Sequence, residues 1–174
     1  DILDLSKVEA GKMELVMEDL SLTSFASSLQ RNFRHVAKER GLEFVVEVDE
    51  QLPATVKTDG GKLEQIANNL LSNAFKFTRA GSVRVHISPV AGRNGRAADV
   101  AIRVSDTGIG IPAPEQQKIF DRFYRVDNGL RRETTGAGIG LASGLALTEP
   151  ASRAWRTRAP ACSNSATAAC CALS

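Results

Sequence analysis

The sequence predicts an α+β fold, a two-layer α/β sandwich in which a mixed sheet carries helices on one face. Two kinds of segment predict it. Apolar residues recur every three or four positions in some stretches, which indicates amphipathic helices. In others they alternate or are β-branched, which indicates strands. Both kinds fit within 174 residues, a length that suits one domain.

The first half of the chain predicts two helices and two strands. Ile2, Leu5 and Val8 share a helical face, so 1–10 is expected to be the end of a helix. Ser21 is a good N-cap residue for the next helix, and Gly41 is a natural stop. The expected elements are a helix end over 1–10, a strand over 12–19, a helix over 21–41 and a strand over 42–48.

The second half begins with a helix capped by Asp59 and running over 60–75. Strands are predicted over 82–88 and 98–105, from alternating valine and isoleucine. A Gly-rich loop at 106–111, a short helix at 115–120, a polar Gly-rich lid at 125–140 and a helix restarting near residue 139 follow.

The composition changes after Ala142. Ten of the last 33 residues are Ala, and none is Val, Ile, Phe, Tyr, Lys or Asp. All three cysteines lie here, at positions 162, 170 and 171, and their spacing matches neither a disulfide framework nor a zinc site. A reducing cytoplasm is therefore the expected compartment.

Charge and hydropathy exclude some classes of protein. The 22 basic and 20 acidic residues give a net charge of +2, too balanced to indicate a nucleic-acid or membrane-surface protein. No apolar run approaches the roughly 18 residues that cross a bilayer. We therefore expect no nucleic-acid partner and no membrane contact by this segment.

Three short motifs have the chemistry of a nucleotide site. Asn69 and Asn73 are four residues apart on a predicted helix, and Lys76 follows one turn later. An amide oxygen can ligate Mg²⁺, and a lysine can place a charge near a phosphate. For this motif alone, a surface amide pair and a solvated lysine are the simpler interpretation.

The second motif is DTGIGI at 106–111, where Asp106 can accept a hydrogen bond from an exocyclic amine such as that of adenine. Gly108 and Gly110 permit close approach to a ring, although a tight turn would use the same residues. The third is GAGIGLA at 136–142, whose backbone N–H groups can attract phosphate at a helix start. It could equally be a flexible linker, and it is neither a Rossmann fingerprint nor a Walker A loop.

The order of these motifs, with IFDRFYR at 119–125 between the last two, resembles the N, G1, F and G2 boxes of sensor histidine kinases. DILDLSKVEAGKMEL at the start is similar to the end of their dimerisation helices. The resemblance covers about residues 1–142. It implies the Bergerat ATP-binding fold of the GHKL superfamily, with ATP and Mg²⁺ as cofactors.

The resemblance also implies roles for individual residues. Asn73 would hold Mg²⁺, Asn69 would lie beside the phosphates, and Lys76 would contact a phosphate. Asp106 would bind the adenine amino group, with Gly108 and Gly110 shaping the pocket. Phe120 and Phe123 would anchor the lid, although plain core packing explains them as well. The lid residues implied near the phosphates are Gly136, Gly138, Gly140 and Leu141.

The implied reaction transfers the ATP γ-phosphoryl to a histidine and then to an aspartate on a response regulator receiver domain. Neither His35 nor His86 has the setting of the family's phosphoacceptor, so no catalytic residue is expected within this chain. The acceptor would lie on the dimerisation hairpin of a parent kinase. We therefore expect a cytoplasmic fragment that cannot phosphorylate itself. The sequence leaves open whether its parent kinase is anchored in a membrane.

Three regions follow from the resemblance: the end of the dimerisation helix at 1–11, the ATP-binding domain at 12–142, and a poorly ordered tail at 143–174 outside the family pattern. A reading-frame shift or truncation near 142–147 is expected to have removed the last two strands, leaving weak, aggregation-prone folding. Two alternatives stay open: a non-catalytic nucleotide-binding remnant, and another GHKL ATPase. The latter carries a general-base Glu where this chain has Asn69.

Overall fold

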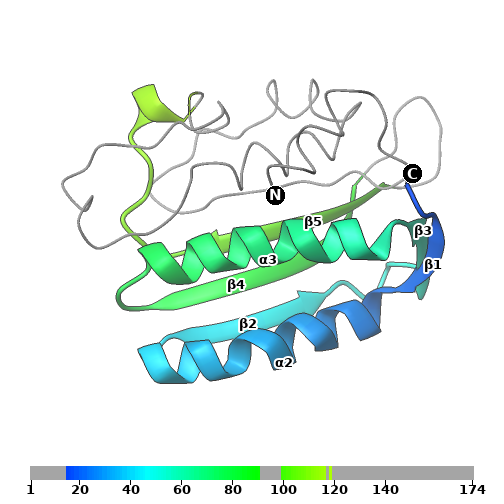
Figure 1. Ribbon diagram of the computed structural model, residues 1–174, viewed down its shortest axis with the longest axis horizontal. Helices are drawn as coiled ribbons and strands as arrows, with labels where there is room; N and C mark the ends of the chain where they lie inside the picture. The colour runs from blue at the N-terminus through cyan, green and yellow to red at the C-terminus, as the bar shows by residue number, and fades with distance from the viewer. Residues whose placement is uncertain (1–14, 91–98, 117, 119–174) are drawn as a thin grey trace.

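The computed structural model describes residues 15–90, 99–116 and 118 (Figure 1). Two long helices and five strands occupy most of this part of the chain. In chain order the elements are β1 (Glu18–Ser21), α2 (Leu22–Arg40), β2 (Glu43–Val48), β3 (Thr55–Thr58), α3 (Gly60–Phe77), β4 (Ser82–Val90), β5 (Asp99–Asp106) and the 3₁₀ helix η2 (Ala113–Glu115).

The main sheet has the strand order β2-β4-β5. β2 runs parallel to β4, and β5 runs antiparallel to it, so the sheet is mixed as predicted. In this register Val85 of β4 lies between Val46 of β2 and Val104 of β5. β1 and β3 form a separate antiparallel pair beside the helices' N-terminal ends (Figure 1).

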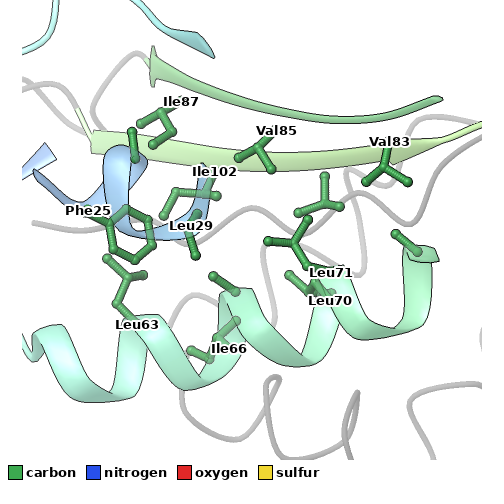
Figure 2. Close-up of a cluster of buried hydrophobic side chains, with 14 of the residues drawn as sticks. Phe25, Leu29, Leu63, Ile66, Leu70, Leu71, Val83, Val85, Ile87 and Ile102 are labelled. Atoms are coloured by element: carbon green, nitrogen blue, oxygen red, sulfur yellow. The ribbon is translucent and has the colours of Figure 1, made fainter. Parts of the chain in front are cut away.

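Both helices cover the same face of the main sheet (Figure 1). Val83, Val85 and Ile87 of β4 are fully buried and point toward α3 (Figure 2). Between them, Arg84 is exposed and His86 is half-buried, because successive side chains of a strand point to opposite faces. The two-layer sandwich with helices on one face is therefore confirmed.

The core between the layers is mostly aliphatic, and Phe25 and Phe75 are its buried aromatic residues. The helix side chains that meet the sheet recur every three or four residues, as the sequence pattern predicts. They include Leu22 of α2 and Ala74 of α3 and, labelled in Figure 2, Phe25 and Leu29 of α2 and Leu63, Ile66, Leu70 and Leu71 of α3.

Helix α2 begins and ends at the residues that the sequence predicts. Ser21 Oγ accepts a hydrogen bond from the Ser24 amide at 3.3 Å. Gly41 has φ of 64°, the left-handed conformation that glycine adopts without steric cost. Its N–H donates to the carbonyls of Ala37 and Lys38, which closes the helix.

An aromatic cluster joins the C-terminal halves of the two helices to β2. The rings of Phe33 and Phe75 stack at 5.5 Å between centroids, and Phe44 packs edge-on against both. Arg40 Nη1 donates to the Phe75 carbonyl at 2.7 Å. The last turn of α3 is thus fixed to α2 as well as to the sheet.

Several predicted boundaries are wrong. In the described part of 12–19, strand pairing starts only at Glu18, and Leu15–Met17 belong to no element. The strand β3 was not predicted, because its burial alternates over only four residues and Val56 is the single apolar residue among them. Helix α3 extends to Phe77, two residues beyond the expected end.

Near the end of the described residues, η2 spans 113–115 where a helix over 115–120 was expected. Residues 117, 119 and 120 lie outside the described part, as do the predicted elements at 1–10, 125–140 and 139 onward. The tail at 143–174 also lies outside it. Within 15–90, 99–116 and 118, no helix is both long and apolar enough to cross a membrane.

Candidate functional site

Helix α3 carries three of the predicted site residues. Its start is fixed by Asp59, whose Oδ1 accepts a hydrogen bond from the Lys62 amide at 2.9 Å. Because the apolar face of the helix is buried against the sheet, the neighbouring positions Asn69 and Asn73 are half-buried at the edge of that contact. They lie four residues apart and so share a face of the helix.

Lys76 lies in the last turn of α3, one turn beyond Asn73. Its side chain is half-buried, and Nζ lies 5.1 Å from the ring centroid of Phe77. A cation over an aromatic face is held by the ring quadrupole. The ammonium group is therefore kept close to the C-terminal end of the helix.

Asp106 is the last residue of β5 and is only 8% exposed. Its Oδ1 accepts a hydrogen bond from the Gly108 amide at 2.9 Å and lies 3.5 Å from the Thr78 hydroxyl. No residue in the described ranges donates to Oδ2. The carboxylate thus keeps one oxygen for an incoming donor.

The turn after Asp106 is tied to the start of β4 by Thr107. Its Oγ1 accepts from the Ser82 amide at 2.9 Å and donates to the Ala80 carbonyl at 3.2 Å. The Thr107 amide donates to the Ser82 carbonyl at 3.1 Å. The side chain and the backbone of Thr107 therefore both hold the turn against the start of β4.

The same turn packs directly on the end of α3. The Ile109 amide donates to the Phe77 carbonyl at 3.4 Å. A Cβ at Gly108 would lie 2.6 Å from that carbonyl oxygen and 2.7 Å from Asp106 Oδ1, so only glycine fits. Gly110 has φ of 66°, which also favours glycine. Two motifs 30 residues apart in the sequence therefore meet: the end of α3, with Lys76, and the turn with Asp106.

Two of the residues that build this junction were missed by the sequence analysis. Thr78 and Thr107 are ordinary turn residues in sequence, and their partners lie 28 and 25 residues away. Ile109 is a third omission: it is 52% exposed, so an apolar side chain three residues after Asp106 faces solvent. Only the exposure of a large apolar residue in a turn distinguishes it.

The remaining predicted residues lie outside the described part of the chain. They are Phe120, Phe123, Gly136, Gly138, Gly140 and Leu141. Among the described residues, no group of three or more His, Cys, Asp or Glu side chains could hold a metal ion. A metal at this site would instead need oxygen atoms from amide side chains and from a bound nucleotide.

The two histidines lie away from this junction. His35 is exposed on α2, and its Nδ1 lies 3.5 Å from Glu39 Oε2, an acidic neighbour that the sequence analysis missed. His86 lies in β4 between Glu47 and Arg103 of the adjacent strands, on the sheet face opposite the helices.

Comparison with known protein families gives one match over residues 58–166, to the family described as histidine kinase-, DNA gyrase B-, and HSP90-like ATPase. The chain belongs to this ATPase family. The match includes α3, Asp106 and its turn, so the junction described above lies within the region that the family shares with this chain.

The curated relatives that match this chain are sensor proteins. Over 149 residues the chain is 37% identical to the autoinducer 2 sensor kinase/phosphatase LuxQ of Vibrio cholerae, covering 86% of this chain and 17% of that protein. It is 41% identical over 143 residues to the aerobic respiration control sensor protein ArcB of Escherichia coli, covering 82% and 18%. The chain thus spans about a fifth of the length of the curated relatives it matches.

Solved structures agree with the fold. ShkA, solved at full length in complex with AMPPNP, superposes with a TM-score of 0.71 at 31% identity, covering 84% of this chain and 29% of that one. The catalytic domain of the histidine kinase ThkA gives 0.62 at 22% identity, covering 79% and 82%, which supports the fold alone. The predicted sensor histidine kinase resemblance and Bergerat-type fold are confirmed, and the other GHKL ATPases are not favoured.

Proposed function

We propose that this chain is the ATP-binding catalytic domain of a sensor histidine kinase, which transfers the γ-phosphoryl of ATP to a histidine on a separate helical hairpin. The observation that carries the proposal is the junction between the Asp106 turn and the end of α3. At this junction the Asp106 carboxylate, which can accept a hydrogen bond from a base, and the Lys76 ammonium, which can attract a phosphate, lie on adjoining elements. Membership of the ATPase family supports ATP as the ligand.

The base end of the site would be formed by Asp106 and Ile109. Asp106 Oδ2 has no donor among the described residues, so it can accept from the exocyclic amine of adenine without losing a bond. The exposed side chain of Ile109 would give apolar surface to the ring. Adenine satisfies both requirements, because it combines a flat apolar face with an amine donor.

The phosphate end would be formed by Asn69, Asn73 and Lys76. The Asn73 amide supplies a neutral oxygen, which suits Mg²⁺ because this ion prefers oxygen ligands and keeps several of its positions for water and phosphate. When bound, Mg²⁺ neutralises charge on the phosphates. Lys76 places a positive charge one turn farther along the helix.

Asn69 bears on the type of reaction. An amide cannot remove a proton from water, so this position cannot act as a general base for hydrolysis. Positioning and charge neutralisation suffice for transfer to a histidine, which is already a nucleophile. The acceptor would come from the dimerisation hairpin of the parent kinase, and a receiver domain would be the next acceptor.

Transfer can be tested with the full chain, γ-labelled ATP, Mg²⁺ and a separately purified hairpin that carries the acceptor histidine. We expect label on the hairpin that is stable to base and lost in acid, as a phosphohistidine is. A hairpin with His→Gln is the matched control and should stay unlabelled. If the chain binds ATP but leaves the native hairpin unlabelled, it is a non-catalytic nucleotide-binding remnant.

A further inference from the structure

Thr78 is a buried polar residue that none of the predicted roles uses. It is the C-cap residue of α3, with an extended backbone and an N–H that donates to the Ala74 carbonyl at 3.1 Å. Its side chain is turned inward and the residue is 2% exposed. A buried hydroxyl without a partner is costly, so its contacts are informative.

The one partner of this hydroxyl among the described residues is Oδ1 of Asp106, at 3.5 Å. The same oxygen accepts the Gly108 amide at 2.9 Å. Two donors therefore converge on Oδ1 of the carboxylate, and no described residue donates a hydrogen bond to Oδ2. The separation of 3.5 Å is long for an O–H···O bond, so this contact is weaker than the Gly108 bond to the same oxygen.

A carboxylate on a short side chain can rotate and exchange its two oxygens, since the terminal torsion of Asp is broad. One donor leaves that rotation partly free, whereas two donors from different elements define the plane of the group. Gly108 belongs to the turn after β5, and Thr78 belongs to the end of α3. The orientation of the Asp106 carboxylate plane therefore depends on both the turn after β5 and the end of α3.

We propose that Thr78 is a positioning residue for base recognition: its hydroxyl holds Oδ1 of Asp106 so that Oδ2 faces the amine of a 6-aminopurine. The proposal rests on the proposed function for the identity of the ligand. It predicts that Thr78 affects selectivity for the amine, and not nucleotide binding in general.

Two variants separate this role from simple packing. Thr78→Val keeps the shape of the side chain and removes the hydroxyl, and Thr78→Ser keeps the hydroxyl. Titration calorimetry with the full chain would compare ATP with purine riboside triphosphate, which lacks the 6-amine. For Thr78→Val we expect ATP to bind about tenfold more weakly, while the affinity for the analogue is unchanged. Thr78→Ser should keep the selectivity of the parent chain.

The proposal is overturned if Thr78→Val weakens both nucleotides equally, because that is the effect of a damaged fold. It is also overturned if Thr78→Val binds ATP as the parent chain does. Combining Thr78→Val with Asp106→Asn gives a further check. If Thr78 acts through the carboxylate, its effect should disappear when Asp106→Asn is already present.

A measurement without ligand distinguishes failure of this proposal from failure of the proposed function. Amide hydrogen exchange at Gly108 reports directly on its bond to Asp106 Oδ1. Thr78→Val should speed exchange at Gly108 and leave it unchanged at Thr107, whose amide is bonded to the Ser82 carbonyl. Equal exchange in the variant and the parent chain would overturn the positioning role even if the parent chain binds no nucleotide.

Discussion

At the scale of single residues, the candidate site depends on how one carboxylate is held. Asp106 is 8% exposed, and no ion pair holds it among the described residues. Its position at the end of a strand could be predicted because a carboxylate followed by Gly-x-Gly is a local pattern, while its role in binding a base stays a prediction. The contact between Thr78 and Asp106 could not be predicted, since only the packing of α3 against β5 brings the two residues together across 28 positions.

The glycine at position 108 gives a prediction at this scale. Gly108→Ala should lower the free energy of unfolding by about 1–3 kcal/mol, because its Cβ would overlap the Phe77 carbonyl oxygen and Asp106 Oδ1. Urea denaturation measures the change. Neither atom can move away without disturbing the end of α3 or the carboxylate.

Gly61→Ala is the matched control. Its Cβ would lie 3.5 Å from Asp59 Oδ1, an ordinary contact, and alanine favours the helix over glycine by up to about 1 kcal/mol. The control should leave stability unchanged or raise it. Equal losses in both variants would contradict the close packing of the turn on α3.

At the scale of elements, local signals predicted the starts of helices better than their ends. Ser21 and Asp59 cap α2 and α3 through bonds to amides three residues later, which a sequence pattern can reveal. The end of α3 is fixed by long-range contacts instead: the Arg40 bond to the Phe75 carbonyl and the Phe33 and Phe44 rings. The sequence pattern therefore ended this helix two residues early.

The cap of α3 gives the prediction at this scale. Asp59 Oδ1 accepts from the Lys62 amide at 2.9 Å, and Oδ2 accepts from the Val16 amide at 3.0 Å. Asp59→Ala removes both bonds and should lower the free energy of unfolding by about 1–2 kcal/mol. Urea denaturation would again measure it. Glu50→Ala, at an exposed position in the turn after β2, is the control and should change stability by less than about 0.5 kcal/mol.

At the scale of the whole molecule, the alternation of helix and strand patterns predicted the two layers and the face that the helices cover. Strand pairing was not predictable in the same way. The order β2-β4-β5 and the separate β1-β3 pair depend on contacts far apart in sequence. The regions assigned to 1–11, 12–142 and 143–174, the altered reading frame and the weak folding expected from it stay predictions. A sharp cooperative melt of the purified chain would contradict the last of these.

The end of β5 and the face of α3 are proposed to form one ATP site, and every functional role above depends on it. Titration calorimetry of the folded full chain with ATP, with Mg²⁺ or with EDTA, tests it. We predict one ATP per chain, bound more tightly with Mg²⁺. Asp106→Asn should weaken ATP binding about tenfold or more, and Asn73→Ala should remove the Mg²⁺ dependence. Asp19→Asn, an exposed change in β1, should have no effect. A folded chain that takes up no ATP, or binds it equally well in both site variants, would contradict the claim.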